Sequence, residues 1–171
     1  MKKILFIIAG EGYQPIEYGI PKKILLDAGM SVVTASNVEG KATASDNSTT
    51  QVDIVLADVI VAEYDGIFIV GGPGAMTFLD YGETYRIVRE AKDAGIYYGA
   101  ICISPRILAH AGVLKGKKVT GWDGDEKLAG IFDSVNAVYI REPVVIDAKL
   151  LTAQGPMAAE AFGMAIREAL V

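Results

Sequence analysis

The sequence has only one cysteine and one histidine among its 171 residues. A single cysteine excludes an internal disulfide framework and, because nothing suggests secretion, favours a reducing cytoplasm. One cysteine and one histidine also cannot supply the four ligands of a structural zinc site, so we expect no metal. Both residues lie in the stretch "YYGAICISPRILAHAGVLKG", as Cys102 and His110. This stretch is therefore the first place to look for function.

Long apolar runs and clustered positive charge are also missing. Apolar residues make up 51% of the chain, but no run approaches the ~20 residues that a membrane span needs. The opening "MKKILFIIAGEG" begins like a signal peptide, yet its apolar part ends at Ala9 without a cleavage site, which favours a buried first strand. The formal charge is −5, and lysines and arginines are scattered. We expect neither a membrane nor a nucleic acid as partner.

Apolar β-rich runs alternate with amphipathic segments along the chain. Strands are predicted at residues 3–9, 31–36, 64–72 and 96–102, a short one at 117–122, and a hairpin or strand pair at 144–155. Helices are predicted at 15–30, 83–95, 104–112, 124–132 and 156–170, and residues 38–59 read as a small hairpin or excursion. This order predicts one α/β domain over residues 1–171, with a mostly parallel central sheet covered on both faces.

Three predicted strand ends carry groups of interest: "AGEGYQPIE", "GGPGAM" and "CIS". Open α/β sheets bind ligands beyond the carboxyl ends of their strands, so the three ends predict one crevice. The glycines do not predict a nucleotide site. "GEGYQP" has Pro15 where a dinucleotide fingerprint has its third glycine, and "GGPGAM" lacks the Lys-Ser/Thr of a phosphate loop. We expect no bound cofactor.

Cys102 has two readings. A lone cysteine after an apolar strand is commonly a packed small residue. However, Cys102 falls at the end of its strand and runs directly into a predicted helix, whose N-terminus would stabilise a thiolate. Gly99, three residues earlier, suits the strained turn that presents a nucleophile in G-x-S-x-G motifs. These features favour a nucleophile at a strand-to-helix elbow.

Glu17 is the second candidate and also has two readings. Acidic residues are favoured in a first helical turn, where Glu17 could be a solvated side chain. It also lies beside apolar Ile16 and Ile20 and beyond the first strand, so its carboxyl could approach the cysteine turn. A protonated Glu17 would donate a hydrogen bond to the thiolate. His110 lies ~12 Å along the helix from Cys102 by helical rise, too far to act as its base.

These residues together resemble the ThiJ/PfpI superfamily, and the resemblance covers essentially the whole chain. It rests on "E-x-x-x-P" (17–21) before "LLDAG", on "YDGIFIVGGPGA", on "GAICISPRILAHAGVLKGKKVTGW" and on "VVIDAKLLTAQGP". The resemblance implies a flavodoxin-like three-layer αβα sandwich and a homodimer or larger homo-oligomer. It also implies that Cys102 is the reactive thiol and Glu17 its hydrogen-bond partner. The backbone N–H groups of Gly72 and Ile103 would form an oxyanion-like pocket.

The sequence departs from this superfamily where a histidine is expected. Peptidase-type members have histidine directly after the elbow cysteine, where this chain has Ile103; others supply one after the next strand, where this chain has Trp122. A Cys-His-acid triad and proteolysis are therefore not expected. The resemblance implies chemistry on small carbonyl compounds, of glyoxalase, deglycase or other hydrolase kind. The alternative is a non-enzymatic, redox-responsive, stress-protective protein whose cysteine oxidises to the sulfinate.

The thiol pKa follows from opposing effects. The helix N-terminus and the two backbone N–H groups would lower it, whereas the apolar neighbours Ile101 and Ile103 would raise it by desolvation. We expect the donors to prevail and predict a pKa of ~5–6.5 for Cys102.

Overall fold

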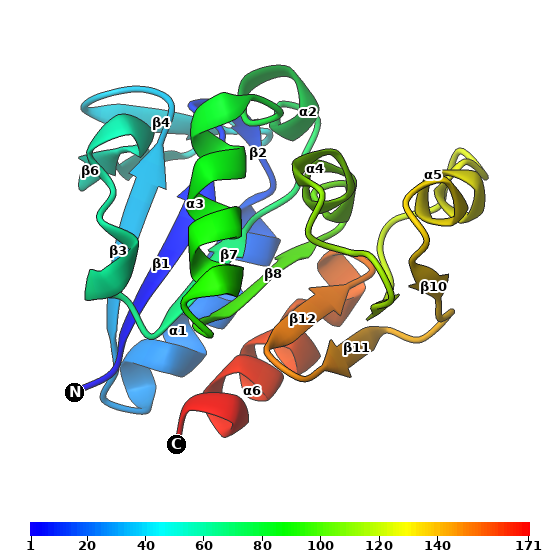
Figure 1. Ribbon diagram of the computed structural model, residues 1–171. Coiled ribbons are helices and arrows are strands. Elements are labelled where there is room, and N and C mark those ends of the chain that lie inside the picture. The colour runs from blue at the N-terminus through cyan, green and yellow to red at the C-terminus, as the bar shows by residue number, and fades with distance from the viewer.

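The computed structural model describes all 171 residues and contains a seven-stranded central sheet (Figure 1). Its spatial order is β11-β12-β8-β7-β1-β3-β6, and every neighbouring pair is parallel except β11 with β12. The strands are β1 (Lys3–Ile8), β3 (Ser31–Ser36), β6 (Ile54–Val55), β7 (Gly66–Ile69), β8 (Tyr97–Ile101), β11 (Val144–Asp147) and β12 (Leu150–Ala153). The prediction of a mostly parallel sheet is confirmed.

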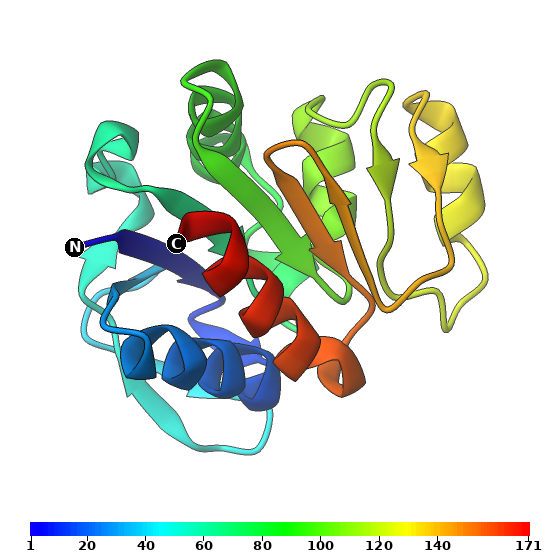
Figure 2. The same ribbon diagram turned by 90° about the horizontal axis from the view of Figure 1, so that it is seen from below.

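Helices cover both faces of this sheet. Helices α1 (Pro15–Asp27) and α6 (Ala159–Leu170) pack against each other on one face. Helices α3 (Gly82–Asp93) and α4 (Pro105–Ala111) pack together on the other. Figure 2 shows the two pairs on opposite sides of the strands, with α1 in blue and α6 in red. This is the sheet covered on both faces that the order of elements predicted, and the three-layer αβα sandwich that the resemblance implied.

An aromatic cluster joins the sheet to the α1–α6 layer. Phe6 of β1 and Phe68 of β7 are fully buried, with ring centroids 6.2 Å apart. Phe6 meets Tyr18 of α1 edge-on, and Phe68 meets Phe162 of α6 in the same way. Such edge-to-face pairs add to the free energy of apolar burial. The cluster therefore fixes α1, the helix that carries Glu17, against the centre of the sheet.

Several short elements differ from the prediction. Residues 38–59 do contain a hairpin, β4 (Lys41–Ala44) with β5 (Thr49–Gln51), but β2 (Glu11–Tyr13), for which no strand was predicted, joins it as a third strand. Strands β9 (Lys118–Val119) and β10 (Val138–Tyr139) form a separate parallel pair beside α5 (Leu128–Ser134). Helix α2 (Ala75–Phe78) follows the glycine turn after β7. Strands of two or three residues give too few alternating positions for a reliable pattern.

The remaining elements are the short 3₁₀ turns Leu56–Asp58, Val61–Glu63 and Pro156–Ala158. No helix has the length and apolarity that crossing a membrane would require.

The chain order of the strands places a topological switch at the middle of the sheet. From β1 the chain moves outward to β3 and β6, and then returns to the other side of β1 to form β7, β8 and β12. The ends of β1 and β7 consequently lie at the switch point of the carboxyl edge, where doubly wound sheets bind ligands. Because β8 lies next to β7, the three strand ends that the sequence singled out are neighbours.

Candidate active site

Cys102 lies in the turn between β8 and α4 with a left-handed backbone, at a φ of 65°. A residue with a Cβ rarely adopts this conformation, and it persists only where the surroundings enforce it. The Cys102 N–H donates to the carbonyl of Ala153 at 3.0 Å, and its carbonyl accepts from the Trp122 N–H at 2.7 Å. The hydroxyl of Ser104 donates to the carbonyl of Val70 at 2.8 Å. Neighbouring strands and loops thus hold the elbow in its strained form.

Glu17, in the first turn of α1, is fully buried. Its Oε2 accepts the N–H of Gly71 at 2.9 Å. Its Oε1 is buried without a nitrogen or oxygen partner, and the carboxyl shares a hydrogen bond with the Cys102 thiol. A Cβ placed on Gly155 would lie 4.0 Å from both Oε1 and the Cys102 Sγ, so oxygen and sulfur face the same point. Glu17 is therefore a buried partner of the thiol and not a solvated helix-start residue.

The two glycines after β7 make room for this pair. A Cβ on Gly71 would come within 2.5 Å of the Cys102 Cβ and 2.6 Å of Glu17 Oε2. Gly72 has a φ of 113°, and its Cβ would meet the backbone of Gly12 and Gln14 at 2.5 Å. Real Cβ atoms do not approach other atoms so closely, so both positions need glycine. The glycine pair brings the β7 turn against the thiol and the carboxyl.

Gly99 has a different role from the one that its spacing suggested. It lies within β8, where its Cβ would collide with the carbonyl of Leu151 on the adjacent strand β12. The glycine is needed for the approach of two strands, and the relief of strain at Cys102 is not its function.

Two backbone N–H groups point to the sulfur, from Gly72 and Ile103, and both lower the thiol pKa. Burial acts in the opposite direction, and together with the charge and hydrogen bond of an ionised Glu17 it raises the thiol pKa to about 12. Burial also raises the pKa of Glu17 to about 7, although the hydrogen bonds from Cys102 and Gly71 lower it. This direction is opposite to our prediction of ~5–6.5, because burial and an ionised Glu17 outweigh the two N–H donors. A low thiol pKa would require Glu17 to stay protonated when the sulfur ionises.

A cavity of about 480 Å³ opens over the thiol. Beyond Cys102, Glu17, Gly72 and Ile103 it is lined by residues of several loops: Gln14, Pro73, Met76, Trp122 and Pro156. Its wall is mostly apolar, and Glu17 is its one ionisable group besides the thiol. The sequence drew attention to Trp122 only as the residue that stands where relatives have a histidine. Met76 and Pro156 had no signal in the sequence, because only the sheet brings their loops together.

His110 does not approach the thiol. Its Nδ1 lies 2.8 Å from a carboxyl oxygen of Asp80, which also accepts the hydroxyl of Tyr85 at 2.7 Å. The histidine ring is about half exposed on the outer side of α4, and it does not line the thiol cavity. No group of three or more histidine, cysteine or acidic side chains is arranged to hold a metal ion.

The arrangement contains several of the groups that a thiolate site needs. The sulfur has an acid partner in Glu17, two fixed N–H donors and an open cavity. Fixed donors at a buried site stabilise negative charge on an attacked oxygen as well as on the sulfur. The site thus has the parts for thiolate addition to a small electrophile, or for oxidation of the thiolate.

The chain is similar to proteins of archaea, bacteria and animals. It is 31% identical to protein YraA of Bacillus subtilis over 95% of both chains, and 30% identical to deglycase PfpI of Pyrococcus furiosus over 90% of both. It is 24% identical to the glutathione-independent glyoxalase DJR-1.2 of Caenorhabditis elegans, covering 99% of this chain and 89% of that protein.

Solved structures agree with this relationship. The ThiJ/PfpI domain protein of Brachyspira murdochii superposes with a TM-score of 0.92 at 28% identity, over 98% of this chain and 95% of that chain. The oxidized DJ-1 of Toxoplasma gondii superposes with a TM-score of 0.87 at 28% identity, over 99% of this chain and 91% of that chain. The model of the DJ-1/PfpI family matches residues 2–169. The elbow cysteine, its buried glutamate and the sandwich around them thus stand in a chain that belongs to the DJ-1/PfpI family.

Proposed function

We propose that Cys102 is a nucleophile for small carbonyl compounds, in glyoxalase-like or deglycase-like chemistry. The observation that carries the proposal is the fully buried Glu17 carboxyl beside a thiol at a left-handed elbow. A packed structural cysteine needs neither an acid partner nor a strained backbone. The names of two relatives, a deglycase and a glyoxalase, support the same kind of reaction.

The proton distribution between Glu17 and Cys102 decides the reactivity of the thiol. The two groups titrate as a pair, so the first proton lost belongs to both. When the remaining proton stays on Glu17, its charge no longer opposes the thiolate and its O–H becomes a third donor to the sulfur. The Gly72 and Ile103 N–H groups supply the other two. We propose that the pair with one negative charge carries that charge on sulfur at neutral pH.

The proposed reaction of an α-oxoaldehyde balances without a cofactor. The thiolate adds to the aldehyde carbon, and the resulting alkoxide takes the proton of Glu17 to give a hemithioacetal. The Glu17 carboxylate then removes the proton from that carbon to give an enediolate and returns it to the neighbouring carbon, while the hydroxyl proton moves to the neighbouring oxygen, which converts the hemithioacetal to a thioester. Water hydrolyses the thioester to a 2-hydroxy acid and restores the thiol. In the deglycase form, the aldehyde arrives as its adduct with an amine or thiol, which is released.

A second candidate function follows from the absence of histidine around the thiol. A positioned base contributes 10²–10⁴-fold to typical reactions, so a site without histidine could turn over slowly or not at all. The thiolate could instead react with peroxide in two steps, each releasing one water, to give the sulfenate and then the sulfinate. The Oε1 of Glu17, which has no nitrogen or oxygen partner, suits a hydrogen bond to a sulfinate oxygen. The chain would then be a redox-responsive, stress-protective protein.

One experiment separates the two functions. Consumption of methylglyoxal is measured for the wild type and for Cys102→Ser, and the mass of each protein is recorded after mild peroxide treatment. Turnover that is lost in Cys102→Ser supports the enzyme. A stable gain of two oxygen atoms on Cys102 without turnover supports the redox function. If the wild type shows neither, Cys102 is a packing residue and both proposals are wrong.

We also propose that the chain forms a homodimer in a reducing, cytoplasmic compartment. Three apolar side chains, Ile16 and Ile20 of α1 and Met164 of α6, are exposed on the two helices that pack side by side. A second copy would cover such side chains. Light scattering during gel filtration measures the mass, and a monomer at micromolar concentration would contradict the homodimer.

A further inference from the structure

Trp122 stands where three hollows of the surface meet. It lines the thiol cavity, a second hollow of about 330 Å³ beside Pro143 and Met157, and a third of about 420 Å³ beside Tyr139 and Arg141. Its side chain is the only tryptophan of the chain and is 39% exposed. A partly exposed indole that lines a mostly apolar cavity offers a surface on which a planar apolar group can stack.

The thiol cavity is larger than a three-carbon aldehyde needs. Methylglyoxal has five non-hydrogen atoms. If each is given the ~30 Å³ that one water molecule takes in the liquid, the aldehyde occupies about 150 Å³. The cavity measures about 480 Å³. Most of its volume is therefore free for a substituent of the aldehyde, and the wall it would meet includes Trp122, Met76 and Pro156.

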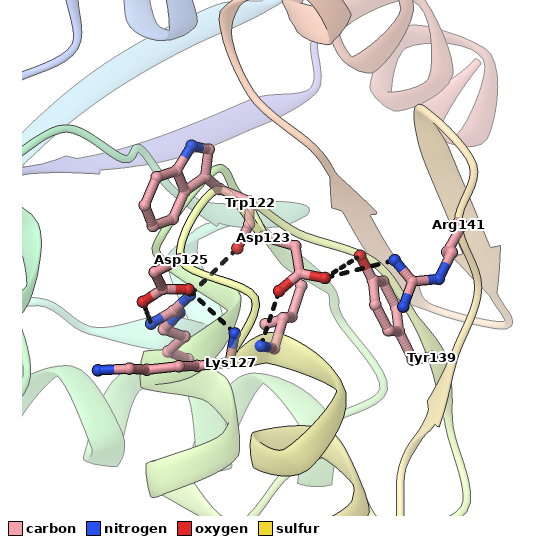
Figure 3. A network of polar contacts seen from close by, with 8 residues as sticks. Trp122, Asp123, Asp125, Lys127, Tyr139 and Arg141 are labelled. Atoms are coloured by element: carbon pink, nitrogen blue, oxygen red, sulfur yellow. Dashed lines mark hydrogen bonds and ion pairs between the residues drawn. The ribbon is translucent and has the colours of Figure 1, made fainter.

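An ion pair beneath Trp122 holds the indole in place. Arg106, on α4, has a buried side chain that donates to both carboxyl oxygens of Asp125 at 2.7 and 2.9 Å. The same guanidinium donates to the Trp122 carbonyl at 3.3 Å and lies 5.5 Å from the centre of the indole ring. In Figure 3, dashed lines join this guanidinium to the carboxylate of Asp125 and to the carbonyl of Trp122. A forked arginine–carboxylate pair fixes orientation as well as distance.

Two further contacts restrict the Trp122 loop and its indole. The backbone N–H of Trp122 donates to the Cys102 carbonyl, which ties the loop to the elbow itself. Gly124 lies against the ring so closely that a Cβ there would collide with it. The Trp122 loop is thus attached to the elbow at one end and to α4 through Arg106 at the other.

We infer that Trp122 determines substrate specificity by stacking on a planar apolar substituent of the aldehyde, and that the Arg106–Asp125 pair is a positioning device for its indole. The inference rests on the proposed nucleophilic role of Cys102. The preferred substrates are α-oxoaldehydes with an aryl group or an adduct of similar size, ahead of methylglyoxal. Trp122 itself takes no part in proton transfer, because an indole N–H is neither an acid nor a base at neutral pH.

The kinetic test compares phenylglyoxal with methylglyoxal. We expect the wild type to prefer phenylglyoxal by about tenfold in kcat/KM, mainly through KM, as an aromatic contact of this kind supplies. Trp122→Ala should lose the preference and Trp122→Phe should keep most of it. Asp125→Asn and Arg106→Met should reduce the preference for phenylglyoxal. Equal kcat/KM for the two aldehydes in the wild type would overturn the inference.

A second test needs no turnover and so separates failure of this inference from failure of the proposed function. The rates at which N-benzyliodoacetamide and iodoacetamide alkylate Cys102 are measured, and each is divided by the rate with free cysteine. The alkylation ratio is the corrected rate of the benzyl reagent divided by that of iodoacetamide. The benzyl reagent should be favoured in the wild type and in Trp122→Phe, but not in Trp122→Ala. If Trp122→Ala keeps the wild-type ratio, the stacking role is wrong even where aldehydes are consumed.

The positioning role of the ion pair has its own readout in the fluorescence of the single tryptophan. Loss of the pair should free the indole, so Asp125→Asn and Arg106→Met should increase its quenching by acrylamide and lower the alkylation ratio. Arg86→Met, which removes an arginine paired with Glu83 and Glu90 on α3, is the matched control and should change neither. Asp125 is at the surface, so its variant tests the pair even if Arg106→Met does not fold. Unchanged quenching and alkylation ratio in Asp125→Asn would exclude a positioning role.

Discussion

Replacing Glu17 by leucine is expected to raise the apparent pKa of the Cys102 thiol by ~1–2 units, which lowers the thiolate fraction 10- to 100-fold at pH values well below the wild-type pKa. A hydrogen bond to a charged group contributes about 1.5–3 kcal/mol, and one pKa unit corresponds to 1.36 kcal/mol. Leucine removes the bond and leaves the thiolate with the N–H groups of Gly72 and Ile103 alone. Glutamine keeps a donor but no titrating proton, so Glu17→Gln should raise the pKa less.

The pH dependence of the wild type follows from the same pair. Burial raises the pKa of Glu17 to about 7, a value for the carboxyl ionising beside a neutral thiol. If the single negative charge of the pair resides on sulfur, the pKa of the first ionisation lies below that value. Thiol reactivity then rises between about pH 5 and 7. Because both groups are acids, the thiolate fraction falls as the pH is lowered through this range. Ultraviolet absorbance of the thiolate and the rate of iodoacetamide alkylation both measure it.

Glu11→Gln is the matched control for this experiment. Glu11 lies exposed on β2, at the same end of the sheet, and removing its charge changes the local potential without removing a bond to the thiol. It should leave the titration unchanged. A wild-type thiol that titrates above about pH 8, or Glu17 variants that titrate like the wild type, would return Cys102 to a packed core residue.

Gly72→Ala is expected to destabilise the fold by about 3 kcal/mol or more. Two effects add: a φ of 113° is strained for a residue with a Cβ, and that Cβ would lie 2.5 Å from backbone atoms of Gln14 and Gly12. Backbone strain costs about 1–3 kcal/mol and overpacking a similar amount. At about 2–4 °C per kcal/mol for a chain of this length, the melting temperature should fall by roughly 6–12 °C. Thermal and urea unfolding measure the loss.

Gly95→Ala is the control that separates the two effects. Gly95 also has a positive φ, of 68°, but a Cβ there meets nothing within 4 Å. It carries only the conformational cost, about 1 kcal/mol. An equal loss in the two variants would mean that the β7 turn can move away from the loop after β1. Such a turn could not hold the Gly72 N–H against the sulfur.

The sequence by itself determined the layers of the fold and the choice of chemical groups. Continuous apolar runs such as residues 3–9 can only be buried on both faces, and helices alternating with them require parallel crossovers. The same order puts strand ends at one edge, so Cys102, Glu17 and the glycine pair could be assigned to one crevice. Local patterns are sufficient for these features, because each depends on a few neighbouring residues.

The tertiary structure decided how those groups act on one another. Whether Glu17 is solvated or buried depends on the packing of α1 against the sheet, which no local pattern records. The role of Gly99 depends on Leu151 in a strand about fifty residues away. The wall made by Trp122 depends on Arg106 and Asp125, which lie on separate elements. These are contacts between distant parts of the chain, and the burial and charge that they create set the pKa values and the shape of the site.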